Sequence, residues 1–249
     1  MSYTTSFAGG ELNTRLFAGQ TDFAFADNTE NYILDVSPIV GGTVAWQGEE
    51  WRIKLGASGV RFDEEFSFLP LYREAYEQAA QMGWAEAGHT AGKLKMNGSW
   101  IKYLSLGAAY DSADWMIQAE ASVTESESDV LTSSYSGYFS LGRKFDSLTL
   151  YSVASFSRNN QDMLKAPEAP APALVPLQQA SQAFFDRLTI EQSSISVGGR
   201  WNIRHNIALK GQIERTWVEP YGSILFETRS TPQSKEIVDS LTLQMDFIF

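Results

Sequence analysis

Residues 240–249, Ser-Leu-Thr-Leu-Gln-Met-Asp-Phe-Ile-Phe, alternate between polar and apolar side chains. The apolar members that share one face of an extended chain are Leu241, Leu243, Met245, Phe247 and Phe249. Only Ile248 is out of phase. A period of two is typical of a β-strand whose two faces meet different surroundings. The stretch therefore predicts an amphipathic strand.

Nine further stretches toward the N-terminus share this alternation. They cover residues 9–22, 34–46, 51–61, 100–110, 115–124, 135–145, 148–158, 193–203 and 207–217. Ten strands in one chain predict an all-β, antiparallel fold that forms a single domain over residues 1–249. Two long connections also contain helical signals. Apolar residues recur at helical spacing from Phe68 to Met82. A Pro/Ala run at 166–176, which favours an extended polyproline conformation, precedes a second helical segment at 177–188.

The connections between these stretches alternate in length. Residues 47–50, 111–114, 146–147 and 204–206 form short connections, while 23–33, 62–99, 125–134, 159–192 and 218–237 form long ones. Short turns at one rim and long loops at the other are typical of a transmembrane β-barrel, with the turns in the periplasm and the loops outside the cell. An even number of strands predicts that both termini lie in the periplasm.

Composition narrows the function. A formal net charge of -11 argues against nucleic acid as a partner, because neutralising phosphates requires a basic surface. The absence of cysteine excludes disulfides and thiolate metal sites, and we expect neither a metal nor a cofactor. The sequence begins without a visible signal peptide, so an exported protein of this kind is expected to be a mature form or a piece of a longer chain.

If the face of Leu241 meets lipid, the alternation directs the opposite side chains into the lumen of the barrel. The predicted pore-lining residues are Arg52, Lys54, Glu120, Lys144, Arg200, Lys210, Glu214 and Asp246. Five bases against three acids give a mildly cationic lumen that would favour anions. The alternative, in which these charges only pair with one another, remains open.

Other residues are expected near the ends of the barrel. Trp51, Trp100, Trp115, Trp201 and Phe249 lie near strand ends, as aromatic girdles at the membrane interfaces require. Leu71, Tyr72 and Tyr76 belong to the first helical segment, which would fold into the lumen as a constriction or plug, or else cap the mouth. We favour the lumen because the helix has an apolar face to bury.

Three blocks of the sequence resemble outer-membrane porins of Gram-negative bacteria, especially the phosphate-selective-porin-like group. They are residues 104–120, residues 137–145, and the pair formed by 206–212 and 238–249. The resemblance implies an outer-membrane channel, with Phe247 and Phe249 as the signal that the barrel-assembly machinery reads. Arg143 stands where such porins carry an aromatic residue, and we expect its side chain to reach the periplasmic headgroups.

Members of that group have about sixteen strands, so two alternatives stay open. Ten strands would close into a small barrel with a narrow lumen, or the chain would be the C-terminal part of a larger barrel. A truncated sheet would expose two unpaired edges that lipid cannot accommodate.

We expect passive diffusion of small hydrophilic, and in particular anionic, solutes in a barrel that contacts outer-membrane lipid and lipopolysaccharide; whether copies associate as a homo-oligomer is left open. The alternative is a non-conducting structural or adhesive barrel that acts through its loops. Enzymatic activity is not expected, because His89 and His205, the only two histidines, fall in connections at opposite rims.

Overall fold

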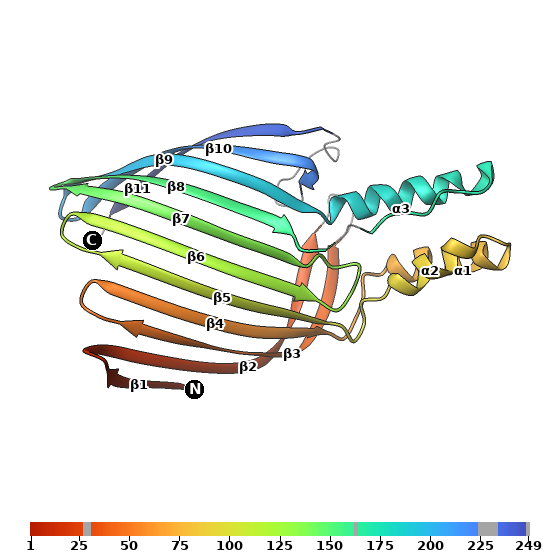
Figure 1. Ribbon diagram of the computed structural model, residues 1–249, viewed down its shortest axis with the longest axis horizontal. Helices are drawn as coiled ribbons and strands as arrows, with labels where there is room; N and C mark the ends of the chain where they lie inside the picture. The colour runs from red at the N-terminus through yellow and green to blue at the C-terminus, as the bar shows by residue number, and fades with distance from the viewer. Residues whose placement is uncertain (27–30, 162–163, 224–233, 248–249) are drawn as a thin grey trace.

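A computed structural model describes residues 1–26, 31–161, 164–223 and 234–247, and contains one sheet of eleven strands. The strands are β1 (Ser2–Phe7), β2 (Gly10–Ala26), β3 (Asn31–Gln47), β4 (Trp51–Phe62), β5 (Trp100–Asp111), β6 (Trp115–Ser126), β7 (Ser134–Phe145), β8 (Leu148–Asn159), β9 (Ile190–Arg204), β10 (Ile207–Ser223) and β11 (Glu236–Phe247). Each strand pairs antiparallel with its sequence neighbours, so the all-β prediction is confirmed (Figure 1).

The ten predicted strands are all present, and β1 is an additional one. It forms a tight hairpin with β2 through Ala8 and Gly9, which both have positive φ angles of 50° and 74°. A two-residue turn of this kind usually carries Asn or Gly at its first position, so Ala8 gave no turn signal. The extra strand makes the count odd, and the N-terminal residue lies beside Leu16 instead of at the turn rim, which corrects the prediction that both termini share one rim.

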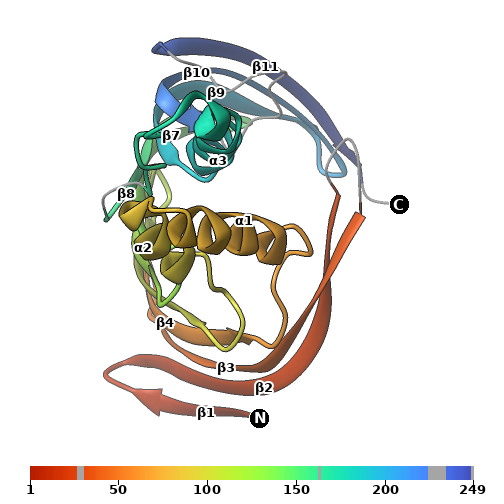
Figure 2. The same cartoon turned by 90° about the vertical axis from the view of Figure 1, so that its right-hand side faces the viewer.

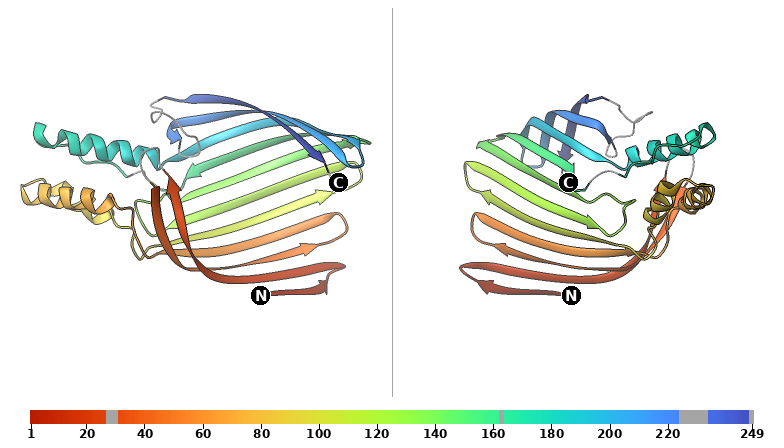
Figure 3. Two further views of the ribbon diagram at one scale, coloured as in Figure 1. Left: turned by 180° about the vertical axis from the view of Figure 1, so that it is seen from behind. Right: turned by 45° about the vertical axis from the view of Figure 1, so that its right-hand side comes forward.

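The β2–β3 hairpin also differs from expectation, because both strands continue through most of the predicted loop 23–33. Register shifts between Gly19 and Thr21 and between Val36 and Ile39 interrupt the ladder there. Such bulges bend a strand. The ends of β2 and β3 accordingly swing away from the rest of the sheet toward the helices (Figure 3).

The sheet is curved but open. Within the described residues, β1 and β11 are its two edges and do not pair with each other. Seen from the helical end, the strands follow an arc with the gap between the first and last strands (Figure 2). In hydrocarbon both edges would have to be paired, either with each other or with further strands, because unpaired backbone groups are costly there.

The register confirms that the two faces of the sheet have different chemistry. Leu55 is the cross-strand partner of Leu106, Ile117 of Leu141, and Ile213 of both Val197 and Leu241. These apolar side chains are largely exposed on the convex face. Most strands have 12 residues, which is enough to cross the hydrocarbon core at the usual tilt.

Three helices stand beyond the loop end of the sheet and form a cap (Figure 1). They are α1 (Leu69–Gln81), α2 (Ala85–Lys93) and α3 (Val175–Arg187), the last preceded by a 3₁₀ turn at Pro172–Leu174. The predicted helices at 68–82 and 177–188 are thus confirmed, whereas α2 was missed and the Pro/Ala run is not extended throughout. No helix among the described residues is long and apolar enough to cross a membrane.

The cap contains the only sizeable buried apolar cluster in the described part of the chain. Leu69, Tyr76, Ala87 and Leu94 are fully buried there, and Phe185 of α3 joins them. The β6–β7 connection holds both helical segments, because the Ser128 hydroxyl donates to the carbonyl of residue 95, after α2, and the Thr132 hydroxyl to that of residue 188, after α3, each at 2.6 Å. The cap is therefore a packed unit held by three connections.

Candidate functional site

All eight residues predicted to line a pore lie on one face of the sheet. Lys210 is the cross-strand partner of Arg200, which in turn faces Thr149 and then Lys144. The other predicted residues share the parity of this row on their strands: Arg52, Lys54, Glu120, Glu214 and Asp246. Lys144, Arg200 and Lys210 line a cavity inside the curve of the sheet, which assigns this row to the concave face, opposite the apolar one. Figure 2 shows this curvature.

The basic residues gather near the turn end of this face. Lys144, Arg200 and Lys210 line a cavity of about 1050 Å³ together with Gln118, Thr149 and Tyr151. Asp246 of β11 lies between two of the bases, with its carboxylate 3.3 Å from the Lys210 ammonium and 3.8 Å from the Arg200 guanidinium. We call Arg200, Lys210 and Asp246 the turn-end cluster; it carries one net positive charge.

Partners of the remaining bases show how far the charges compensate one another. Lys144 pairs with Asp111 and donates to the carbonyl of Ser112 at 2.9 Å. The Arg52 guanidinium donates to the Gln47 side chain. Within the described residues Lys54 has no ion pair. Of the eight predicted residues, Lys144, Arg200, Lys210 and Asp246 form ion pairs, whereas the other four form none within the described part of the chain. Some positive charge on this face is therefore uncompensated.

Sequence reasoning missed several residues of the concave face. Arg15 and Glu11 of β2 share its parity, but the weak alternation of residues 9–22 left that strand without an orientation. Asp111 was assigned to a turn, whereas it ends β5 and reaches Lys144. Together with the eight predicted residues, these three give six bases and five acids, so the positive excess of this set is one charge instead of the predicted two.

Tyr151 illustrates how glycine shapes the cavity. Its ring lies over Gly198, where an added Cβ would be 2.6 Å from the ring carbon and from the hydroxyl oxygen. The absence of a side chain lets Tyr151 reach across β9, so that its hydroxyl donates to Gln212 of β10 at 3.1 Å. Gln212 in turn donates to Glu214 at 3.2 Å. This polar chain fixes side chains across three strands of the wall.

The helix predicted as a constriction does not lie inside the sheet. Tyr76 is fully buried against Trp84, with ring centroids 5.7 Å apart, and Tyr72 stacks on Phe184 of α3 at 6.1 Å. Leu71 is 67% exposed. The prediction that this helix folds into the lumen is wrong, because its apolar face is buried against α2 and α3, whereas the concave wall is polar. The placement matches the alternative, a cap over the mouth.

An ion pair holds α1 to the end of β4. The Arg73 guanidinium binds both carboxylate oxygens of Glu65, at 2.8 and 3.0 Å, and also donates to the carbonyl of Leu94 at 2.9 Å. This bidentate contact lowers the pKa of Glu65, and burial opposes the effect only in part. Burial raises the pKa of the Tyr76 hydroxyl, which faces Ser181 of α3. The Glu65–Arg73 ion pair thus links the cap to the wall, and protonation of Glu65 in acid would break it.

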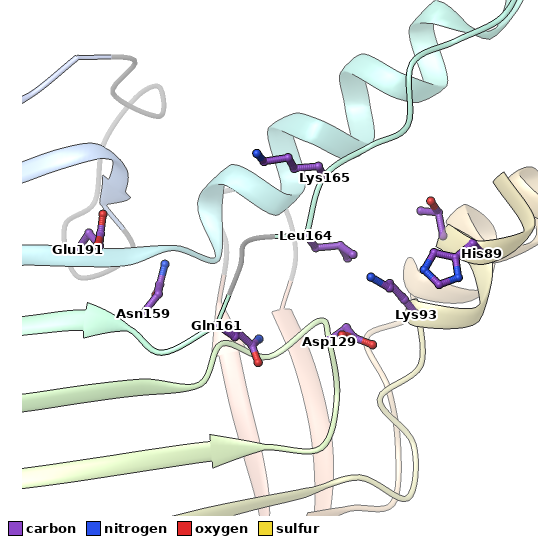
Figure 4. A pocket seen from close by; sticks show the side chains of 9 residues that line it. His89, Lys93, Asp129, Asn159, Gln161, Leu164, Lys165 and Glu191 are labelled. Carbon is purple, nitrogen blue, oxygen red and sulfur yellow. The ribbon is translucent and has the colours of Figure 1, made fainter. Parts of the chain in front are cut away.

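A second cavity, of about 620 Å³, opens where the cap meets the sheet (Figure 4). Its lining has both signs of charge: His89 and Lys93 come from α2, Asp129 from the β6–β7 connection, and Glu191 from β9. Because no single charge dominates, the lining does not favour one class of ligand. His205 lies in the β9–β10 turn at the other end of the sheet, so the two histidines do not share a site.

Comparison with solved structures identifies the architecture. An anion-selective porin from Comamonas acidovorans matches all of this chain with a TM-score of 0.59 at 13% sequence identity. The chain has a porin-like fold. It covers 58% of that porin's length, which is less than two thirds. No protein-family model matches the sequence, and no curated protein does. The phosphate-selective-porin-like assignment therefore remains a prediction.

Aromatic residues mark the turn end of this porin-like sheet. Trp51, Trp115 and Trp201 are exposed on the convex face near the turn ends of their strands, as predicted for a girdle, and Phe247 adds a further aromatic residue there. Trp100 instead begins β5 at the loop end, and Phe249 lies outside the described residues. Arg143 lies within this girdle, with its guanidinium 4.6 Å from the centre of the Trp115 ring and 3.9 Å from Asp114. Where the resembling porins have an aromatic residue, this chain thus has an arginine that packs on the ring of Trp115.

Proposed function

We propose that this chain forms the wall of an outer-membrane channel for passive diffusion of small hydrophilic solutes, with a preference for anions. One observation carries the proposal: a continuous antiparallel sheet is apolar on its convex face and polar, with clustered bases, on its concave face. The apolar face is exposed and not packed against a core, as expected for a sheet with lipid outside and water inside.

The preference for anions rests on the turn-end cluster. Arg200 and Lys210 share a single carboxylate, so one positive charge is available to attract anions into the cavity. The solved porin with the same fold is described as anion-selective, and we extend that property to this chain. Catalysis has no part in the proposal.

The proposed membrane position follows from the convex face. Lys102 is the tenth residue counted from the turn end of β5, Arg158 the eleventh of β8, and Arg215 the ninth of β10. About ten tilted residues cross the hydrocarbon core, so these bases would lie at the opposite interface from the aromatic girdle. There they would contact the phosphates of lipopolysaccharide. Assembly through Phe247 and Phe249 by the barrel-assembly machinery, and association into a homo-oligomer, remain proposals.

The test is ion conductance of the purified, refolded chain in planar bilayers. A stepwise conductance whose reversal potential in a salt gradient indicates anion preference would support the proposal. A cation-selective pore would refute the role of the turn-end cluster. Absence of conductance, together with binding of the protein to surfaces or cells, would instead favour a structural or adhesive barrel acting through the packed cap.

A further inference from the structure

The middle of the concave face has a chemistry different from that of its turn end. Between the turn-end cavity and the cap, cross-strand partners on β6 to β9 carry hydroxyl groups instead of bases. We call this region the hydroxyl patch and define it by six residues: Glu120, Ser122, Ser136, Tyr138, Ser155 and Ser194. The proposed preference for anions does not explain it.

Two pairs of serines meet across strands within the patch. The hydroxyl oxygens of Ser122 and Ser136 are 2.9 Å apart, and those of Ser155 and Ser194 are 2.8 Å apart. A serine hydroxyl has one donor hydrogen and two acceptor lone pairs. Each pair uses one donor internally, so each still offers a donor and several acceptors to the lumen. Such groups suit a solute that both donates and accepts hydrogen bonds, whereas a simple anion would use only the donors.

Tyr138 lies between the two serine pairs. It is the cross-strand partner of Ser155 on one side and of Glu120 on the other, and it is 38% exposed. Its ring gives the patch one flat apolar surface beside the polar groups. A tyrosine at a binding surface combines an apolar body with a polar tip, so it can cover the face of a ring that carries hydroxyl groups at its edge.

Glu120 adds a strong acceptor to the patch. Within the described part of the chain its carboxylate has no ion pair and no hydrogen-bond partner. It lies over Gly107, where an added Cβ would be 3.4 Å from a carboxylate oxygen. A negative charge at this position would repel anions but would accept hydrogen bonds from neutral hydroxyl groups.

From this combination we infer that the hydroxyl patch is a binding subsite for a neutral, polyhydroxylated solute of the sugar class. The inference rests on the proposed channel function and names a second class of solute for it. Tyr138 contacts the ring of the sugar, Glu120 accepts from its hydroxyls, and the serine pairs donate and accept at its edge. Neighbouring strands lie about 4.8 Å apart, so groups of the patch on adjacent strands are separated by about the width of one sugar ring.

The experiment uses maltose as the probe. Added to the purified 249-residue chain in planar bilayers, maltose should lower the ion current at a measurable half-blocking concentration. Tyr138→Ala and Glu120→Gln should each raise that concentration about fivefold, as expected for the loss of about one net hydrogen bond or ring contact. A polyethylene glycol of similar size controls for simple exclusion of volume, and its effect should not change in either variant.

Ser152→Ala is the matched control, because Ser152 lies on the convex face of β8, where its partner is Leu141. It should leave both the half-blocking concentration and the reversal potential unchanged, and Tyr138→Ala should leave the reversal potential unchanged. An open channel whose current maltose affects equally in the original chain, Tyr138→Ala and Glu120→Gln would overturn the subsite but not the channel.

Saturation-transfer NMR of the refolded protein in detergent reads sugar binding without requiring conductance. Maltose contact that weakens in Tyr138→Ala supports the subsite even if no current is seen, in which case only the channel proposal fails. No contact with maltose in a properly folded sample refutes the subsite.

Discussion

Replacing Asp246 by asparagine should make the channel more anion-selective. The carboxylate lies 3.3 Å from Lys210 and 3.8 Å from Arg200, and all three side chains are at least a third exposed to the lumen. In a water-like dielectric each of these contacts amounts to about 1 kcal/mol. A mobile anion could take over this attraction once the fixed carboxylate is neutral.

The magnitude follows from these two contacts. Their sum, about 2 kcal/mol, is an upper limit, because exposed side chains and salt ions screen the interaction. With screening, the free energy by which the lumen attracts a mobile anion should increase by about 1 kcal/mol, which corresponds to about a fivefold rise in the permeability ratio of chloride to potassium. The assay is the reversal potential of single channels in a potassium chloride gradient, and the rise should become smaller as the salt concentration increases.

Asp239→Asn supplies the matched control for this change. Asp239 lies on the same strand, but on the convex face, where both of its oxygens accept from Arg215 at 2.7 and 2.8 Å. The substitution removes the same charge from the chain without changing the lumen, so the reversal potential should stay the same. An equal shift in both variants, or no shift in Asp246→Asn, would refute the assignment of the two faces.

Three further outcomes are expected. Because Arg73 lowers the pKa of Glu65, their contact stabilises the cap fully at pH values above the ordinary carboxyl pKa and is lost as the pH falls through the lowered pKa of Glu65. Amide hydrogen exchange in α1 should therefore become faster in this acidic range. Glu65→Gln should abolish this pH dependence. Arg143→Gln should lower stability toward urea by about 1 kcal/mol through loss of the contact with Trp115, and an unchanged midpoint would contradict this. Deleting residues 64–98 should leave channels that still conduct, because the cap lies beyond the strand ends. Conductance should rise if the cap narrows the mouth. A pore that conducts only after the deletion would show that residues 64–98 plug the lumen.

The local sequence pattern predicted most of the strands, because the alternation of a strand between lipid and water does not depend on residues far away in the chain. Alternation with a period of two assigns each residue to a face, and all eight predicted wall residues, from Arg52 to Asp246, share the concave face for that reason. The same logic missed β1, since Ala8 carries no turn signal, and it left Arg15 unassigned because the alternation around it is weak.

What the tertiary structure alone decided involves contacts between segments far apart in the chain. The helix at Leu69–Gln81 has an apolar face in any context. Only the stacking of Phe184 on Tyr72, and the buried cluster that this helix shares with Val130, show that the face is buried in a cap and not in the lumen. The sharing of Asp246 by two neighbouring strands and the serine pairs likewise depend on register, which is set by the assembled ladder. Periodicity determines which face a side chain occupies; only the folded sheet determines its neighbours.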